Sequence, residues 1–155
     1  MTRTLILVNE MVVFLGASMY FGTGWSTVLF SFPITPELTV DNYYLHFVPQ
    51  VKAAVRVFTI LTGVMIATGL VMLIAEWGTG LVWVPAVVIV LVAGSATLTV
   101  SLILPINRRM ADGITDPAEL REALVRWKTL TSVRVALWTL EWLVMAIFFA
   151  VRAKS

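Results

Sequence analysis

Four charged residues stand inside stretches that are otherwise apolar: Glu10, Arg56, Arg134 and Glu141. An ionisable group within a membrane-spanning helix is expensive, and it commonly marks a binding site, a proton pathway or an ion pair. Arg134 and Glu141 are seven residues apart, which on a helix places them on nearly the same face, about 10 Å apart. Arg56 and Arg134 could hold an anionic or enolate oxygen, with Glu141 as base or counter-ion. Alternatively, one arginine pairs with Glu141 and holds two helices in register.

Aromatic residues and the single histidine accompany these charges. Trp127 and Trp138 flank Arg134 in the sequence, and they could stack on a flat ligand or pack against lipid or the protein core. Tyr43, Tyr44 and His46 fall in a predicted loop near the same membrane face. They could form the mouth of a pocket, with His46 as an acid or base, or an aromatic belt beside a solvated histidine.

The composition excludes several kinds of chemistry. The chain contains no cysteine and only one histidine, so disulfides, thiolate catalysis, cysteine-ligated metals and a haem held by two histidines of this chain are excluded. A metal site would need mostly carboxylate ligands or a partner chain, and we predict neither a metal nor a cofactor. Lysines and arginines form no run with interleaved aromatic residues, so we expect no nucleic-acid binding.

The overall composition indicates that these residues are positioned by membrane-spanning helices. The chain has 155 residues, of which 59% are hydrophobic and 13% charged, whereas soluble domains carry about 25% charged residues. The mean hydropathy is +0.93. A helix needs about 20 apolar residues to cross the hydrocarbon core, and four stretches qualify. We therefore predict an all-α, four-transmembrane-helix bundle forming one membrane domain over residues 1–155, with spans at about 5–32, 51–75, 81–106 and 129–151.

The polar connection at 107–128 has the pattern of a short helix. Asp116 followed by Pro117 is typical of a helix start, and Leu120, Leu124 and Trp127 then fall on one face. We predict a short interfacial helix that runs into the fourth span. It could be a lid over a cavity or a plain interfacial helix.

Lysine and arginine counts predict the orientation of the bundle. Cytoplasmic loops of membrane proteins carry the excess of these residues. The side with the termini and the 76–80 turn carries three lysines and arginines, namely Arg3, Arg152 and Lys154. The side with the two longer loops carries six, namely Lys52, Arg108, Arg109, Arg121, Arg126 and Lys128. We expect a bacterial plasma membrane, with the long loops cytoplasmic.

Three weaker patterns complete the prediction. Each half of the chain has an apolar helix ending at a proline, Pro33 or Pro105, followed by a helix with an early arginine; this is a loose echo and no strict repeat. Gly63 and Ala67 are spaced for close helix packing. Glu10 and its polar neighbour interrupt the first apolar run, so we expect that segment to be retained and not cleaved as a signal peptide.

Several motifs in the second half resemble a known family. The run Leu104-Pro105-Ile106-Asn107, followed by Trp127 and Val133-Arg134, resembles the anthrone-oxygenase-like family of small four-helix membrane proteins. That family shows a Pro-Leu-Asn-like exit from its third helix and a later W-x-x-x-N-H-x-R arrangement. The resemblance covers residues 104–151, and the remainder matches by hydropathy and length alone.

The resemblance implies a fold and a class of ligand. Asn107, Trp127 and Arg134 match the family pattern, but Thr131 and Ser132 stand in place of its Asn-His pair. Members with the activity oxidise polycyclic phenolic anthrones without an obvious metal or flavin. By resemblance, Asn107 and Arg134 would orient a ligand oxygen. Together with the residues above, the candidate ligand-binding set is His46, Arg56, Asn107, Trp127, Arg134, Trp138 and Glu141.

Three functions are compatible with these patterns. The first is a membrane protein with a polar-lined pocket inside the bundle for a lipophilic aromatic or quinone-like molecule, either an anthrone-oxygenase-like enzyme or a relic of one. The second is a non-catalytic accessory subunit that stabilises a larger membrane complex, with homo-oligomers or partner chains in the bilayer. A transporter is the third, but four helices without a broken-helix pattern disfavour it.

Overall fold

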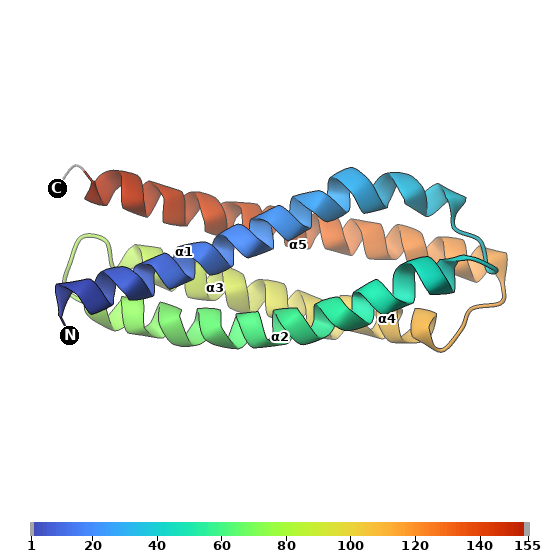
Figure 1. The fold of residues 1–155 in the computed structure, drawn as a ribbon, viewed down its shortest axis with the longest axis horizontal. Coiled ribbons are helices and arrows are strands. Elements are labelled where there is room, and N and C mark those ends of the chain that lie inside the picture. Colours follow the sequence, from blue (N-terminus) through green and yellow to red (C-terminus); the bar gives the residue numbers. More distant parts are fainter. Residues whose placement is uncertain (1, 154–155) are drawn as a thin grey trace.

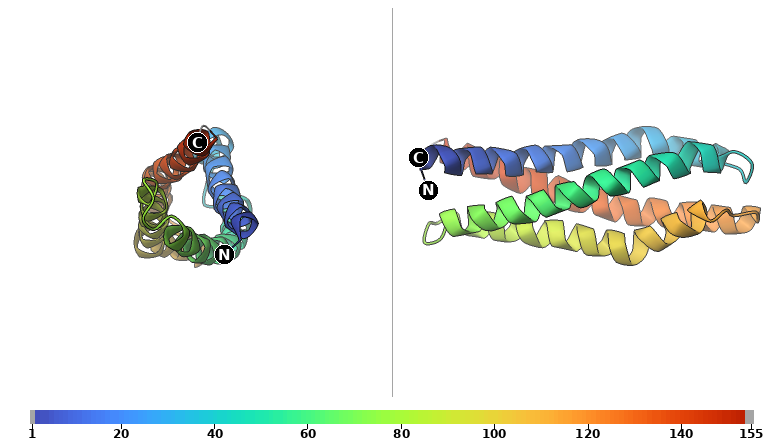
Figure 2. Two further views of the ribbon diagram at one scale, coloured as in Figure 1. Left: turned by 90° about the vertical axis from the view of Figure 1, so that its left-hand side faces the viewer. Right: turned by 60° about the horizontal axis from the view of Figure 1, so that its bottom comes forward.

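Four helical rods run up and down along the long axis of the protein, and residues 2 and 153 lie at the same end (Figure 1). The computed structural model describes residues 2–153. The rods form a ring in which α1 and α3 each pack against both α2 and α5 (Figure 2). Each rod is long and apolar enough to cross a membrane. The helices are α1 (Arg3–Ser26), α2 (Tyr43–Ala75), α3 (Trp83–Leu98), α4 (Leu104–Ala111) and α5 (Pro117–Arg152).

The four predicted apolar stretches are all helical, but α2 begins earlier than expected. It starts at Tyr43 and includes Pro49, so the segment with Tyr43 and His46 is helix and not loop. A proline inside a helix removes one backbone hydrogen bond. The buried side chains of Tyr43, Phe47 and Val48, which join a core cluster with α4 and α5, offset that loss.

The sequence predicted that the first and third helices end at Pro33 and Pro105. That prediction is wrong, because the helical chain continues past both prolines. Each follows a wider π-helical turn, Thr27–Ser31 or Thr99–Ile103, in which the hydrogen bonds span five residues. Because a proline ring collides with the carbonyl four residues earlier, the wider turn lets the chain continue. The first rod then ends in a 3-10 helix, Phe32–Glu37, and the third continues as α4.

The two π turns reveal an internal repeat stronger than the loose echo in hydropathy. Residues 22–35 and 94–107 align without a gap, and the ring places α1 diagonally opposite α3, as expected for two similar helical hairpins. The matching pairs are Gly22 and Gly94, Thr23 and Ser95, Thr27 and Thr99, Val28 and Val100, Pro33 and Pro105, Ile34 and Ile106, and Thr35 and Asn107.

The helix start predicted at Asp116 and Pro117 is confirmed, but the segment is the first part of the continuous helix α5 and not a separate short helix. The Asp116 side chain accepts a hydrogen bond from the Ala118 N–H at 3.1 Å, and α5 then runs without a break to Arg152. The stripe of Leu120, Leu124 and Trp127 is buried in the core cluster near the two long loops. The Tyr43 hydroxyl ties α2 to this region, because it donates to the Met110 carbonyl at 3.1 Å and accepts from the Ile114 N–H at 2.5 Å.

Glu10 has a structural partner that lies far away in the sequence. Arg152 donates hydrogen bonds to the carboxylates of both Glu10 and Glu76, the latter at 2.8 Å. Glu10 is fully buried and Glu76 nearly so. This cluster links α1, the end of α2 and the end of α5, so the intramembrane charge at Glu10 is explained by charge pairing.

The small pair on α2 does not pack inside the chain. Gly63 and Ala67 are both exposed, and a side chain built at Gly63 would meet no other atom nearby. The prediction of close packing by this pair is therefore wrong within the chain. Gly16 instead provides the close approach, since its α-carbon lies directly against the Met65 side chain.

Candidate functional site

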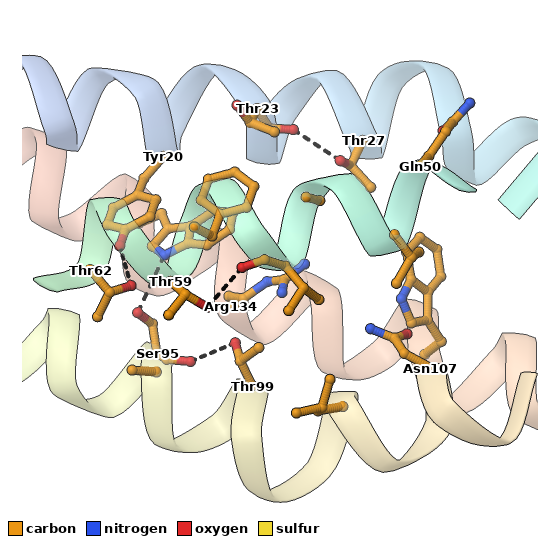
Figure 3. Close-up of a pocket in the computed structure, with 18 of the residues that line it drawn as sticks. Tyr20, Thr23, Thr27, Gln50, Thr59, Thr62, Ser95, Thr99, Asn107 and Arg134 are labelled. Atoms are coloured by element: carbon orange, nitrogen blue, oxygen red, sulfur yellow. Dashed lines mark hydrogen bonds between the residues drawn. The ribbon is translucent and has the colours of Figure 1, made fainter. Parts of the chain in front are cut away.

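A central cavity of about 490 Å³ lies among α1, α2, α3 and α5 (Figure 3). This volume is within the range of about 300–1,000 Å³ for small-molecule sites. The cavity separates the two core clusters of the bundle, since its walls include Tyr20 and Trp138 from one cluster and Phe47 and Trp127 from the other. The bundle therefore has a hollow middle between two packed ends.

Arg134 is the only charged residue that lines the central cavity among residues 2–153. Its guanidinium lies over the Trp138 ring, 4.7 Å from the ring centre. The Nε atom is buried without a hydrogen-bond partner, and the described chain offers Arg134 no ion pair. A buried cation normally finds an anion or hydrogen-bond acceptors. The cavity therefore presents an uncompensated positive charge.

Aromatic rings close the cavity at both ends. Trp138 stacks on Tyr20 at 4.8 Å with 5° between the rings, and on Phe58 at 5.4 Å. Trp127 meets Phe47 edge-on at 4.8 Å. The pairs Phe58–Trp138 and Phe47–Trp127 both join α2 to α5, and the two residues of each pair are equally far apart along the chain. The Trp138 Nε1 donates to the Ser95 hydroxyl at 3.3 Å, which fixes the indole plane facing Arg134.

Hydroxyl groups line the walls between these aromatic ends. The Thr27 hydroxyl donates to the Thr23 carbonyl at 2.9 Å, and the Thr99 hydroxyl donates to the Ser95 carbonyl at 2.7 Å. These two pairs occupy matching positions of the internal repeat. Because each threonine hydroxyl donates its proton to a backbone carbonyl of its own helix, its oxygen can still accept a hydrogen bond from a ligand.

Asn107, Trp127, Arg134 and Trp138 line the central cavity together. Figure 3 shows Arg134 projecting between α2 and α3, with Asn107 toward one end. The Asn107 Oδ1 is buried without a hydrogen-bond partner among residues 2–153, so it accepts no bond from Arg134. Arg134 thus faces the bundle interior, where it and Asn107 line the same cavity without touching through this oxygen.

Glu141 does not pair with Arg134. It is fully buried, and both carboxyl oxygens lack a hydrogen-bond partner within residues 2–153. Seven residues of helix separate the two side chains by about 10 Å, and Trp138 lies between them and holds the guanidinium. Glu141 lies outside the cavity lining, so the predicted ion pair is wrong.

Arg56 and His46 lie on the outer surface. On α2, Ala54 and Phe58 line the cavity, and Arg56 lies midway between them along the helix, which turns its side chain outward. His46 precedes the buried Phe47 and is exposed. Neither Arg56 nor His46 therefore lines the central cavity.

Sequence reasoning did not single out the hydroxyl residues of the first and third rods. Aligning the chain on Thr27-Val28 and Thr99-Val100 would have found them, because the matching serine and threonine positions all line the cavity. In the described part of the chain, no three histidines or acidic residues lie close enough together to hold a metal ion.

Comparison with protein-family models, curated proteins and solved structures finds no match.

Proposed function

We propose that this membrane protein binds a flat, lipophilic aromatic or quinone-like molecule with an anionic or strongly polarised oxygen. The observation that carries the proposal is the Arg134 guanidinium, which faces the central cavity without an anionic partner. An oxygen of the ligand would supply the missing hydrogen bonds, and charge-assisted bonds of this kind are the stronger ones. The stacked rings around Trp138 suit a flat ligand.

Binding is better supported than oxygenation. The resemblance to anthrone-oxygenase-like proteins favours a polycyclic phenol as the ligand, but Thr131 and Ser132 replace the Asn-His pair. The Ser132 hydroxyl is exposed and bonds to the Lys128 carbonyl at 2.9 Å. The Thr131 hydroxyl is buried without a partner. Neither side chain can act as an imidazole base at neutral pH, so a relic of such an enzyme fits these positions better than an active one.

Quenching of tryptophan fluorescence tests this function directly. We expect 1-hydroxyanthraquinone to quench the purified protein with at least roughly tenfold higher affinity than anthracene, because only the former offers oxygens to Arg134. Equal affinities would contradict the proposal. Conversion of anthrone to anthraquinone above the rate without protein would add oxygenase activity to binding.

An accessory subunit is the second candidate, and the outward pair Gly63 and Ala67 favours it. Such a pair allows another helix to approach closely within the bilayer. Failure of every aromatic probe to bind, combined with loss of self-association in Gly63→Leu, would favour this candidate over ligand binding.

We also propose that the connections at 38–42 and 112–116 face the cytoplasm of a bacterial plasma membrane. Six lysines and arginines near that end against three near the other support this orientation; one of the three, Lys154, lies outside the described residues. The chain contains no cysteine, so single cysteines at 78 and 112 can be probed on intact cells. We expect an impermeant thiol reagent to label position 78 alone until the cells are permeabilised. Labelling of 112 alone would reverse the orientation.

A further inference from the structure

A side cavity of about 190 Å³ lies between α2 and α4, next to the central cavity. The two cavities share Val51, Val55, Leu104 and Asn107 in their walls. Asn107, whose amide oxygen has no hydrogen-bond partner within residues 2–153, therefore lies in the wall between the two cavities. The side cavity thus adjoins the central cavity on the flank formed by α2 and α4.

Two cations flank the side cavity, Lys52 on α2 and Arg108 on α4. Both are exposed, and neither side chain has a hydrogen bond or ion pair with another residue in the range 2–153. The adjacent Arg109 differs, since it forms an ion pair with Glu119 at 2.6 Å. The two cations of the side cavity are therefore free to bind an anion.

The internal repeat shows that this pair of cations is specific to one side of the bundle. The internal repeat aligns Arg108 with Pro36. The pairs Phe47–Trp127 and Phe58–Trp138 give the alignment of α2 with α5, and the same separation along the chain aligns Lys52 with Ser132. The equivalent face between the first rod and α5 has no cation at either position. The cation that does lie there, Lys128, is already engaged, because it donates to the Phe32 carbonyl at 3.4 Å and lies over the Phe32 ring. A general excess of surface charge would not distinguish the two halves in this way.

We infer that the ligand is an amphiphile with an anionic head group, a carboxylate or a phosphate, which is held by Lys52 and Arg108. This inference rests on the proposed ligand binding in the central cavity. The apolar body of such a molecule passes Asn107 into that cavity, while its charge stays at the membrane surface. An amphiphile in a bilayer already has this orientation, so it can enter sideways without moving its charge through hydrocarbon.

Two matched probes test the inference in nanodiscs of phosphatidylcholine. Anthraquinone-2-carboxylate carries the anionic group, and 2-(hydroxymethyl)anthraquinone is its neutral counterpart. The double variant Lys52→Gln/Arg108→Gln should weaken binding of the carboxylate by about tenfold and leave the neutral probe nearly unchanged, as expected for the loss of two partly exposed charge contacts. The control Arg121→Gln/Arg126→Gln removes two exposed cations on α5 that line neither cavity, and it should change neither affinity.

The outcomes distinguish the role of Lys52 and Arg108 from the proposed ligand binding in the central cavity. Equal effects of the double variant on both probes, or no effect on either, would overturn the role of Lys52 and Arg108 and leave ligand binding intact. Failure of the wild-type protein to bind either probe would overturn both. Nanodiscs containing phosphatidylglycerol identify the source of the anion: competition with the carboxylate indicates an anionic lipid, and its absence indicates a free amphiphilic anion.

Discussion

Replacing Arg134 with methionine is expected to weaken binding of a polar-oxygen aromatic ligand strongly while leaving the protein folded and more stable. The charge-assisted hydrogen bonds lost to the ligand correspond to about 1.5–3 kcal/mol, or a fall in affinity of roughly 10- to 100-fold. Within residues 2–153 the guanidinium has no anionic partner, and an apolar replacement for a buried charge stabilises proteins by about 1–4 kcal/mol. Quenching titrations and thermal unfolding in detergent measure the two effects.

Arg56→Met is the matched control for this change. Both arginines stand between two valines, but Arg56 lies on the outer surface and Arg134 in the cavity. We expect Arg56→Met to leave ligand affinity unchanged. Arg134→Lys should recover part of the binding, since it keeps the charge and loses the flat stacking on Trp138. An Arg134→Met protein with undiminished affinity would remove the main support for the proposed function.

Replacing Arg152 with methionine is expected to destabilise the bundle strongly. The change leaves the carboxylates of Glu10 and Glu76 buried side by side without a cation. Removing one partner of a buried ion pair destabilises a protein by about 3–5 kcal/mol. The Arg152 side chain is 37% exposed, so solvent screens part of the effect and we expect a loss of about 1–3 kcal/mol. Thermal unfolding in detergent at neutral pH measures it.

Two further variants separate this effect from a loss of packing. Adding Glu10→Gln and Glu76→Gln to Arg152→Met removes both stranded charges and should restore most of the stability. Arg3→Met changes an exposed cation at the same end of the bundle and should have little effect. If the triple variant is no more stable than Arg152→Met alone, the cluster stabilises the bundle by packing and not by charge.

The amino-acid sequence by itself determined the membrane-spanning helices and one of their ends. Long apolar stretches can satisfy their backbone hydrogen bonds within the bilayer only as helices, so local composition is sufficient to predict them. Asp116 and Pro117 likewise act on the backbone of their own first turn. The resemblance in the second half also identified Asn107, Trp127 and Arg134, which the fold brings to one cavity.

Only the tertiary structure decided which charges are buried together and which face outward. Arg56 and Arg134 have the same valine neighbours, yet the rotation of each helix within the ring places one outside and the other inside. Glu10 forms an ion pair with Arg152, at the other end of the chain, whereas the Glu141 carboxyl group has no partner within residues 2–153. Helix rotation and long-range pairing depend on how side chains of all four rods pack simultaneously. No local pattern of residues contains that information.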